Sequence, residues 1–320
     1  MKNLLQRILF FGLVLNCLAC QQSVTDKSTL AIFTPSKQAS GNSTITKLDD
    51  YWYQGKAEIS SYDLAQVRYR DQHPGEAVLI FVTEDFLTDK QVKNDNYTNK
   101  NSTPILKNNS VRRFTTGIYD YSIMTSVFTP TNTEKFPNTQ KVTISAQDWC
   151  GQSFMQFNRE KSKYKVVLRS YFESEGDKDF TVNASLLEDE LMNRIRINPD
   201  ALPVGKTSLV PSATILRLMH LPTRSFEANI TKGKYKGNEL GKKDLIAYTI
   251  DYPELDRQVT IFYQQKAPYI IEGWQDTYRA ISGEKLTTRA TRKQTVMTPY
   301  WQQNNVREVK LRKDLDLVTF

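Results

Sequence analysis

Histidine and cysteine are scarce in this sequence, with two histidines and three cysteines among 320 residues. Three cysteines cannot make a disulfide framework, and so few histidines argue against a histidine-rich metal site. The mean hydropathy is too low for a protein with several membrane-spanning helices. Aromatic residues are plentiful instead, with 16 Tyr, 15 Phe and 4 Trp. This content is typical of a folded globular chain and not of a disordered one.

The N-terminal residues 1–19 predict a lipoprotein signal peptide. Lys2 and Arg7 supply its positive charge, and the apolar run at 8–15 is too short to anchor the chain by itself. The run ends in Cys-Leu-Ala-Cys at 17–20, which resembles a bacterial lipobox, where a small residue precedes the cysteine that is lipidated. We therefore expect Cys20 to carry the lipid. An ordinary secretory peptide cut nearby is the alternative.

Lipidation at Cys20 would place the protein in the cell envelope. Two or more acyl chains, at ~0.8 kcal/mol per buried CH₂, make an essentially permanent anchor. Gln21 follows the cysteine, and the common Gram-negative sorting rule then favours the outer membrane. We expect a lipid-anchored, periplasm-facing protein. Residues 20–48 are rich in Ser, Thr and Gln and predict a flexible tether behind the anchor.

Positive charge exceeds negative charge, with a formal net charge of +8 that falls to +6 when Lys2 and Arg7 are removed. Such a charge can indicate nucleic-acid binding. An exported, lipidated chain rarely meets nucleic acid, so we interpret the charge as that of an envelope protein near anionic lipids or glycans. The expected partners are the membrane, through the anchor, and a lipid or an envelope protein. No nucleic acid is expected.

Residues 49–320 predict a single β-rich domain. From Tyr51 onward the hydrophobic pattern mostly has period two and is rich in Val, Ile, Thr, Tyr and Phe. The Asn-rich segment 87–111 predicts a long exposed loop. The expected fold is mainly β, a large curved antiparallel sheet or incomplete barrel that commonly closes over a hydrophobic cavity. The predicted strands are 56–60, 63–70, 76–84, 112–118, 121–129, 140–147, 152–158, 163–174, 209–219, 223–231, 244–251, 257–264, 269–279 and one near 305–312.

One helix is predicted, over about 186–196. Ser185 and the glutamate three positions later fit a capping box. The acidic residues 188–190 suit the positive end of a helix dipole, and Arg194 and Arg196 suit the negative end. We expect this helix to end before Pro199, to pack on the sheet and to join the two halves of the sheet.

The densest group of aromatic residues lies at 248–278. Its side chains are able to line a pocket or simply to fill a core, and the pattern leaves both interpretations open. We predict no metal, no cofactor and no catalytic residue here. The candidate ligand-binding residues of this stretch are Tyr252, Arg257, Ile261, Tyr263, Trp274 and Asp276.

Cys150 lies in a segment, Trp-Cys-Gly-Gln-Ser at 149–153, that resembles the thioredoxin active-site stretch with its second cysteine replaced. Ser153 cannot resolve a mixed disulfide. We therefore interpret Cys150 as a buried cysteine that packs as a small hydrophobe at a turn or strand edge. A nucleophile formed by Cys150 with His73 or His220 is an alternative.

Glu173, Glu175 and Asp177 alternate, so on a strand they would share one face at ~7 Å steps. Paired carboxylates at such a spacing are typical of glycosidases, and acidic residues around Gly176 also suit Ca²⁺. A solvated turn is the simplest interpretation. The alternative to a non-catalytic protein is therefore an envelope hydrolase that acts on glycan through Glu173 and Glu175.

A resemblance to a known family is carried by residues 51–59, 77–86, 117–130, 147–158 and 248–278. These segments resemble an uncharacterised Bacteroidota lipoprotein family, and the resemblance covers about residues 50–320. Some of its members carry the label "septum formation inhibitor Maf", but the Ser-x-Ser-x-x-Arg segment of true Maf pyrophosphatases does not follow the signal peptide here. The family has no established catalytic residues to carry over.

The expected sheet is more loosely similar to periplasmic lipoprotein carriers and other half-barrel lipid binders, a likeness of fold alone. The residues themselves combine a β-rich aromatic body with few histidines and cysteines. The leading hypothesis is therefore a non-catalytic cell-envelope lipoprotein that binds an apolar ligand or an envelope partner.

Overall fold

The computed structural model describes residues 48–241 and 244–318, which belong to one unit, Thr44–Phe320. The predicted signal peptide and Cys20 lie outside the described residues, as does the predicted tether up to residue 47. Among the helices of the described part, none is long and apolar enough to cross a membrane.

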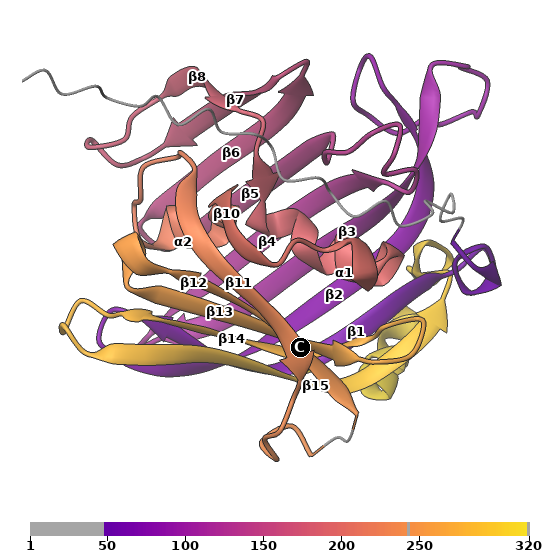
Figure 1. Cartoon of the computed structure of the whole chain (residues 1–320). Coiled ribbons are helices and arrows are strands. Elements are labelled where there is room, and N and C mark those ends of the chain that lie inside the picture. Colours follow the sequence, from indigo (N-terminus) through magenta and orange to yellow (C-terminus); the bar gives the residue numbers. More distant parts are fainter. Residues whose placement is uncertain (1–47, 242–243, 319–320) are drawn as a thin grey trace, which may run out of the picture. The chain divides into compact units, whose positions relative to one another are not determined.

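One sheet of 15 strands dominates this unit (Figure 1). The first strand, β1, lies at the centre of the sheet, since it pairs with β2 on one side and with the last strand, β15, on the other. From there β2 to β8 follow one another outward, and β15 back to β9 do the same on the other side. The strands are β1 (Ala57–Arg68), β2 (Asp71–Leu87), β3 (Ser102–Thr116), β4 (Tyr119–Pro130), β5 (Lys141–Asp148), β6 (Gly151–Glu160), β7 (Lys163–Ser170), β8 (Lys178–Asn183), β9 (Leu186–Leu187), β10 (Gly205–Val210), β11 (Phe226–Lys234), β12 (Leu245–Tyr252), β13 (Arg257–Gln264), β14 (Ile271–Arg279) and β15 (Lys285–Thr298).

The sheet is strongly curved. Its two edge strands are consecutive in the chain, because β8 ends at Asn183 and β9 begins at Leu186. A link of this length reaches at most about 10 Å, so the curvature brings the edges together at this point. No hydrogen-bonded ladder joins β8 to β9 in the described part of the chain, and the sheet remains open. The predicted large curved antiparallel sheet is confirmed, with β9 and β10 as its one parallel pair among the described strands.

Two short α-helices, α1 (Leu191–Ile197) and α2 (Ala213–Leu218), lie on the concave face of the sheet (Figure 1). Leu191 and Ile195 of α1 are fully buried in the main core, and Asn193 Nδ2 donates to the carbonyl of Leu106 in β3 at 2.8 Å. The prediction that this helix packs on the sheet is thus confirmed. The 3₁₀ helices are η1 (Asp50–Trp52), η2 (Glu188–Glu190), η3 (Pro199–Ala201), η4 (Pro253–Leu255), η5 (Tyr300–Gln302) and η6 (Val306–Leu315).

The start of α1 differs from the predicted capping box. Ser185 Oγ contacts the hydroxyl of Ser225 at 2.5 Å and does not cap the helix. The backbone N–H of Leu187 instead donates to Glu190 Oε1 at 3.0 Å, and a 3₁₀ turn precedes the α-helix. The sequence match was misleading because Ser185 finds a partner on a segment distant in the chain.

The helix α2 occupies part of a segment, 209–219, for which we predicted a strand. Ser212 Oγ accepts the N–H of Ile215 at 3.4 Å and caps this helix. All of its residues are buried, Thr214 and Arg217 included, and a short buried run carries no period that separates strand from helix. Similarly, the strand expected near 305–312 is the 3₁₀ helix η6.

Strand β3 begins at Ser102, well inside the segment 87–111 that predicts a loop. Its asparagines Asn108 and Asn109 pair in register with β2 and β4 and are buried. Asparagine is a turn residue in isolation, and here the ladder overrides that preference. Two other strands, β8 and β15, carry so many charged residues that the sequence pattern missed them.

Candidate functional site

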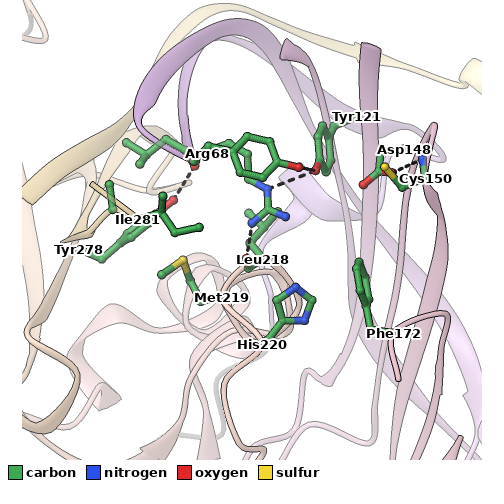
Figure 2. Close-up of a pocket in the computed structure, with 13 residues that line it drawn as sticks. Arg68, Tyr121, Asp148, Cys150, Phe172, Leu218, Met219, His220, Tyr278 and Ile281 are labelled. Atoms are coloured by element: carbon green, nitrogen blue, oxygen red, sulfur yellow. Dashed lines mark hydrogen bonds between the residues drawn. The ribbon is translucent and has the colours of Figure 1, made fainter. Parts of the chain in front are cut away.

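A cavity of about 310 Å³ opens at one end of the curved sheet (Figure 2). Hairpin turns, the C-terminal end of α2 and the loop after β7 converge on it. Its walls are mostly apolar, and its polar groups are few. The lining residues are Val67, Arg68, Tyr69, Tyr121, Asp148, Cys150, Phe172, Leu218, Met219, His220, Tyr278, Ala280 and Ile281.

Arg68 is the main cation of this cavity. Its Nε donates to the hydroxyl of Tyr121 at 3.2 Å, and its Nη1 donates to the carbonyl of Leu218. The guanidinium lies 4.5 Å from the ring centroid of Tyr69 and 5.5 Å from that of Tyr121, within cation–π range. Burial lowers the pKa of Arg68, but its contacts with the two tyrosine hydroxyls raise that pKa above the usual value overall. The side chain is therefore a fixed, oriented positive charge.

Three tyrosine hydroxyls form a chain beside Arg68. Tyr119 donates to Tyr69 at 2.8 Å, and the hydroxyls of Tyr69 and Tyr121 are 2.8 Å apart. The ring of Tyr121 stacks on that of Phe114 with centroids 4.7 Å apart. These contacts fix the aromatic wall of the cavity.

Glu175 is buried next to the cavity-lining residue His220 and forms an ion pair with Arg217. Its Oε2 accepts from Arg217 Nη1 at 2.7 Å and from Ser170 Oγ at 2.5 Å, and its Oε1 lies 3.0 Å from His220 Nδ1. Burial raises the pKa of Glu175, but the contacts with Ser170, His220 and Arg217 lower it overall. The carboxylate holds the end of α2 in place.

The predicted pairing of Glu173 with Glu175 requires a strand, and β7 ends at Ser170. Residues 171–177 form a turn in which Glu173 is exposed while Glu175 is buried. The two side chains therefore do not share the face of a strand or one cleft. Within the described residues, no cluster of three or more His, Cys, Asp or Glu side chains suits a metal ion.

Cys150 is exposed, so the prediction of a buried cysteine is wrong. Asp148 pairs with Gly151 in the ladder, which leaves Trp149 and Cys150 as the tip of a two-residue turn. Asp148 Oδ1 accepts the N–H of Cys150 at 2.6 Å and stabilises this turn. Cys150 and His220 both line the cavity, although His220 directs its Nδ1 at Glu175.

Large apolar side chains are exposed on the turns around the cavity. Ile118, Trp149, Tyr171 and Ile281 are 83%, 69%, 67% and 72% exposed. The four lie in the β3–β4, β5–β6, β7–β8 and β14–β15 connections, all at the same end of the sheet. Exposed apolar side chains gathered around a cavity mouth are typical of a surface that meets a ligand, a partner or a membrane.

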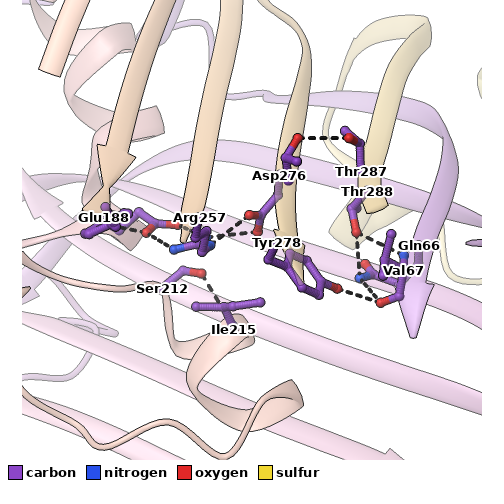
Figure 3. Close-up of polar contacts among 12 residues, drawn as sticks. Gln66, Val67, Glu188, Ser212, Ile215, Arg257, Asp276, Tyr278, Thr287 and Thr288 are labelled. Carbon is purple, nitrogen blue, oxygen red and sulfur yellow. Dashed lines mark hydrogen bonds and ion pairs between the residues drawn. The ribbon is translucent and has the colours of Figure 1, made fainter. Parts of the chain in front are cut away.

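The predicted ligand-binding residues of 248–278 do not line this cavity. Arg257 instead forms a buried ion-pair network with Asp276 and Glu188, and all its contacts lie between 2.7 and 2.9 Å (Figure 3). Tyr252 donates to Glu188 at 2.9 Å. Burial raises the pKa of Glu188, but Arg257 lowers it overall.

Ile261, Trp274 and Asp276 line a second, smaller cavity of about 60 Å³ between the sheet and the helices, whereas Tyr263 is packed in the core. Three buried atoms of this cavity have no hydrogen-bond partner among the described residues: Asn108 Oδ1, Arg112 Nε and Trp274 Nε1. A space of this size with unpaired polar atoms on its wall is large enough for a few water molecules. Sequence reasoning missed Arg112, since one arginine in a strand carries no signal.

Comparison of the chain with protein-family models, curated proteins and solved structures finds no match.

Proposed function

We propose that this protein is a non-catalytic lipoprotein of the cell envelope that holds an apolar ligand in the 310 Å³ cavity. The observation that carries the proposal is the cavity itself, mostly apolar and open at one end of the sheet. Its volume lies at the lower end of the ~300–1,000 Å³ range of small-molecule sites. Pre-ordered polar groups on an apolar wall are the usual composition of such sites.

The exposed side chains around the mouth support the same function. Trp149, Tyr171 and Ile281 offer an apolar path between the cavity and its surroundings. Trp and Tyr are also the residues that favour the boundary between water and lipid. A ligand that leaves a lipid phase would therefore meet favourable contacts before it enters.

The proposal includes the lipid anchor at Cys20, an outer-membrane location facing the periplasm and membership of the Bacteroidota lipoprotein family. The Cys-Leu-Ala-Cys pattern at 17–20 supports the anchor and the location, and the resembling segments within residues 50–320 support the family membership. An anchored protein would keep the cavity within reach of the membrane.

The experiment uses the full chain, expressed with its export signal and washed gently. Native mass spectrometry should detect a co-purifying mass that organic solvent extracts. The variant Ile281→Asp puts a charge at the mouth and should lower the bound fraction several-fold. Val204→Asp is the matched control, because Val204 is also an exposed aliphatic residue, 60% exposed, and does not line the cavity.

A clean apo mass, together with no binding of an uncharged fluorophore such as phenylnaphthylamine, would refute the ligand proposal and favour an envelope-protein partner. The glycan-hydrolase alternative gains no support from the geometry. Glu175 is committed to Arg217 and His220, and Glu173 lies exposed on a turn.

A further inference from the structure

The charge of Arg68 is not balanced by a carboxylate. No Asp or Glu of the described residues lies within 4.0 Å of its guanidinium, although many other arginines of the chain are paired in this way. Its hydrogen bonds go to the Tyr121 hydroxyl and the Leu218 carbonyl, and it also contacts the Tyr69 hydroxyl. All three groups are neutral. Arg68 is half-buried, and a cation that is partly removed from water without a counter-charge is unfavourable.

The other ionisable side chains on the cavity wall do not neutralise Arg68. Asp148 accepts the N–H of Cys150, and within the described residues no ion pair joins it to Arg68. His220 faces Glu175, which is itself paired with Arg217. Figure 2 shows Arg68 and Asp148 separated by Tyr121. Within the described part of the chain, Arg68 is thus the one cation on this wall without a carboxylate partner.

The position of the guanidinium also suits an incoming group. Two of its nitrogens, Nε and Nη1, are held by Tyr121 and Leu218. Figure 2 draws no hydrogen bond from Nη2, while the guanidinium also contacts the Tyr69 hydroxyl and lies within 5.5 Å of the ring centroids of Tyr69 and Tyr121. An arginine fork with free N–H groups is the preferred receptor for carboxylate and phosphate oxygens.

We propose that the ligand of this cavity is an amphiphile with an oxyanion headgroup, a carboxylate or a phosphate, that Arg68 receives while the apolar walls hold the chain. This inference rests on the proposed function and names its ligand class. The headgroup supplies the missing counter-charge, and Leu218, Met219 and Ile281 contact the hydrocarbon.

The test compares decanoate, decyl phosphate and decanol, which share one chain and differ in headgroup. Each displaces phenylnaphthylamine, which is uncharged, from the full-length protein. A charge-assisted hydrogen bond should make at least one anion bind about tenfold more tightly than decanol. A preference confined to decanoate or to decyl phosphate identifies which oxyanion is the natural headgroup. Equal affinity for all three compounds overturns the headgroup inference and leaves the proposed function intact.

Failure of phenylnaphthylamine and of all three compounds to bind, together with a clean apo mass, refutes the proposed function itself, so the two failures are distinguishable. The variant Arg68→Gln should abolish the preference for the anion while decanol still binds, and Arg68→Lys should retain part of the preference. Asp148→Asn is the matched control, since it removes a charge of opposite sign from the same wall and should preserve or increase the preference. Should Arg68→Gln fail to fold, Arg68→Lys and the wild-type headgroup comparison decide the question. A preference unchanged in Arg68→Lys and in high salt would contradict a role for this charge.

Discussion

Arg257 and Glu188 face each other through two parallel hydrogen bonds of 2.7 Å, from Nη1 to Oε2 and from Nη2 to Oε1 (Figure 3). This bidentate pair ties β13 to the 3₁₀ turn before α1, so it joins the sheet to the helical segment inside its curve. Asp276 of β14 binds the other side of the guanidinium. Glu188 also accepts from the Tyr252 hydroxyl at 2.9 Å and from Ser212.

Removal of Arg257 should therefore be strongly destabilising. The variant Arg257→Met leaves Glu188 and Asp276 buried without their cation, and losing one partner of a buried pair costs roughly 3–5 kcal/mol. Urea unfolding followed by circular dichroism measures the loss. As the control, Arg279→Met breaks the half-exposed pair between Arg279 and Asp256 and should cost less than about 1 kcal/mol. Equal losses of unfolding free energy in the two variants would show that the buried network stabilises the fold no more than the half-exposed pair does.

Asp189 gives the fold a pH dependence. Burial raises the pKa of its carboxyl from 3.8 to about 7, so the folded state holds this proton more tightly than the unfolded chain does. The stabilisation from that proton is complete below about pH 4 and is lost as the pH rises towards 7. Relative to wild type, Asp189→Asn should gain stability over this window, on the order of 4 kcal/mol at its upper end. Asparagine keeps an oxygen that can accept the N–H of Ala213.

The measurement is denaturant unfolding of both proteins at several pH values between 4 and 8. The difference between them isolates Asp189 from other carboxyls, such as Glu58 and Glu175, whose pKa values are lowered. A difference that stays constant across this range would contradict a raised pKa for Asp189.

Much of the fold follows from local pattern. The prediction for residues 257–264 coincides with β13, because Val259, Ile261 and Tyr263 alternate towards the core. The hydrophobic pattern did not predict strands in which polar or charged residues occupy the paired positions. Asn108 and Asn109 sit inside a ladder, and β15 alternates threonine with arginine and lysine. In these strands the pairing partners decide the structure, and the partners are far away in sequence.

The candidate site was harder to predict, since its residues come from turns that the topology brings together. Tyr69, Cys150, His220 and Ile281 are far apart in the chain and meet only because their connections lie at one end of the sheet. The aromatic stretch 248–278 gave a strong composition signal, but its side chains mostly fill the core. The tight turn at Asp148 was a usable signal for exposure of Cys150, because a residue at the tip of a two-residue turn has little to pack against.

Gly75 should tolerate no side chain. A Cβ at this position of β2 would lie 2.3 Å from the carbonyl oxygen of Arg113 on β3, a contact that requires the two backbones to separate. Gly75→Ala should therefore destabilise the fold by roughly 1–3 kcal/mol, the range for overpacking. Gly233→Ala in β11 is the matched control, since nothing lies within 4 Å of its Cβ position. That variant should be neutral or slightly stabilising in the same urea titration, and a similar loss in both would refute the steric reason.

Cys150 offers a direct readout of the cavity, since its side chain is exposed and lines the wall. A membrane-impermeant maleimide should label the folded protein quickly, without denaturant. An amphiphile that occupies the cavity should then slow this labelling, because it lies between the reagent and the sulfur. Decanoate should protect Cys150 in wild type and protect it less in Arg68→Gln, whereas Asp148→Asn should keep the protection. Labelling that requires unfolding would contradict the exposed turn, and labelling at one rate with and without every amphiphile would place the ligand elsewhere.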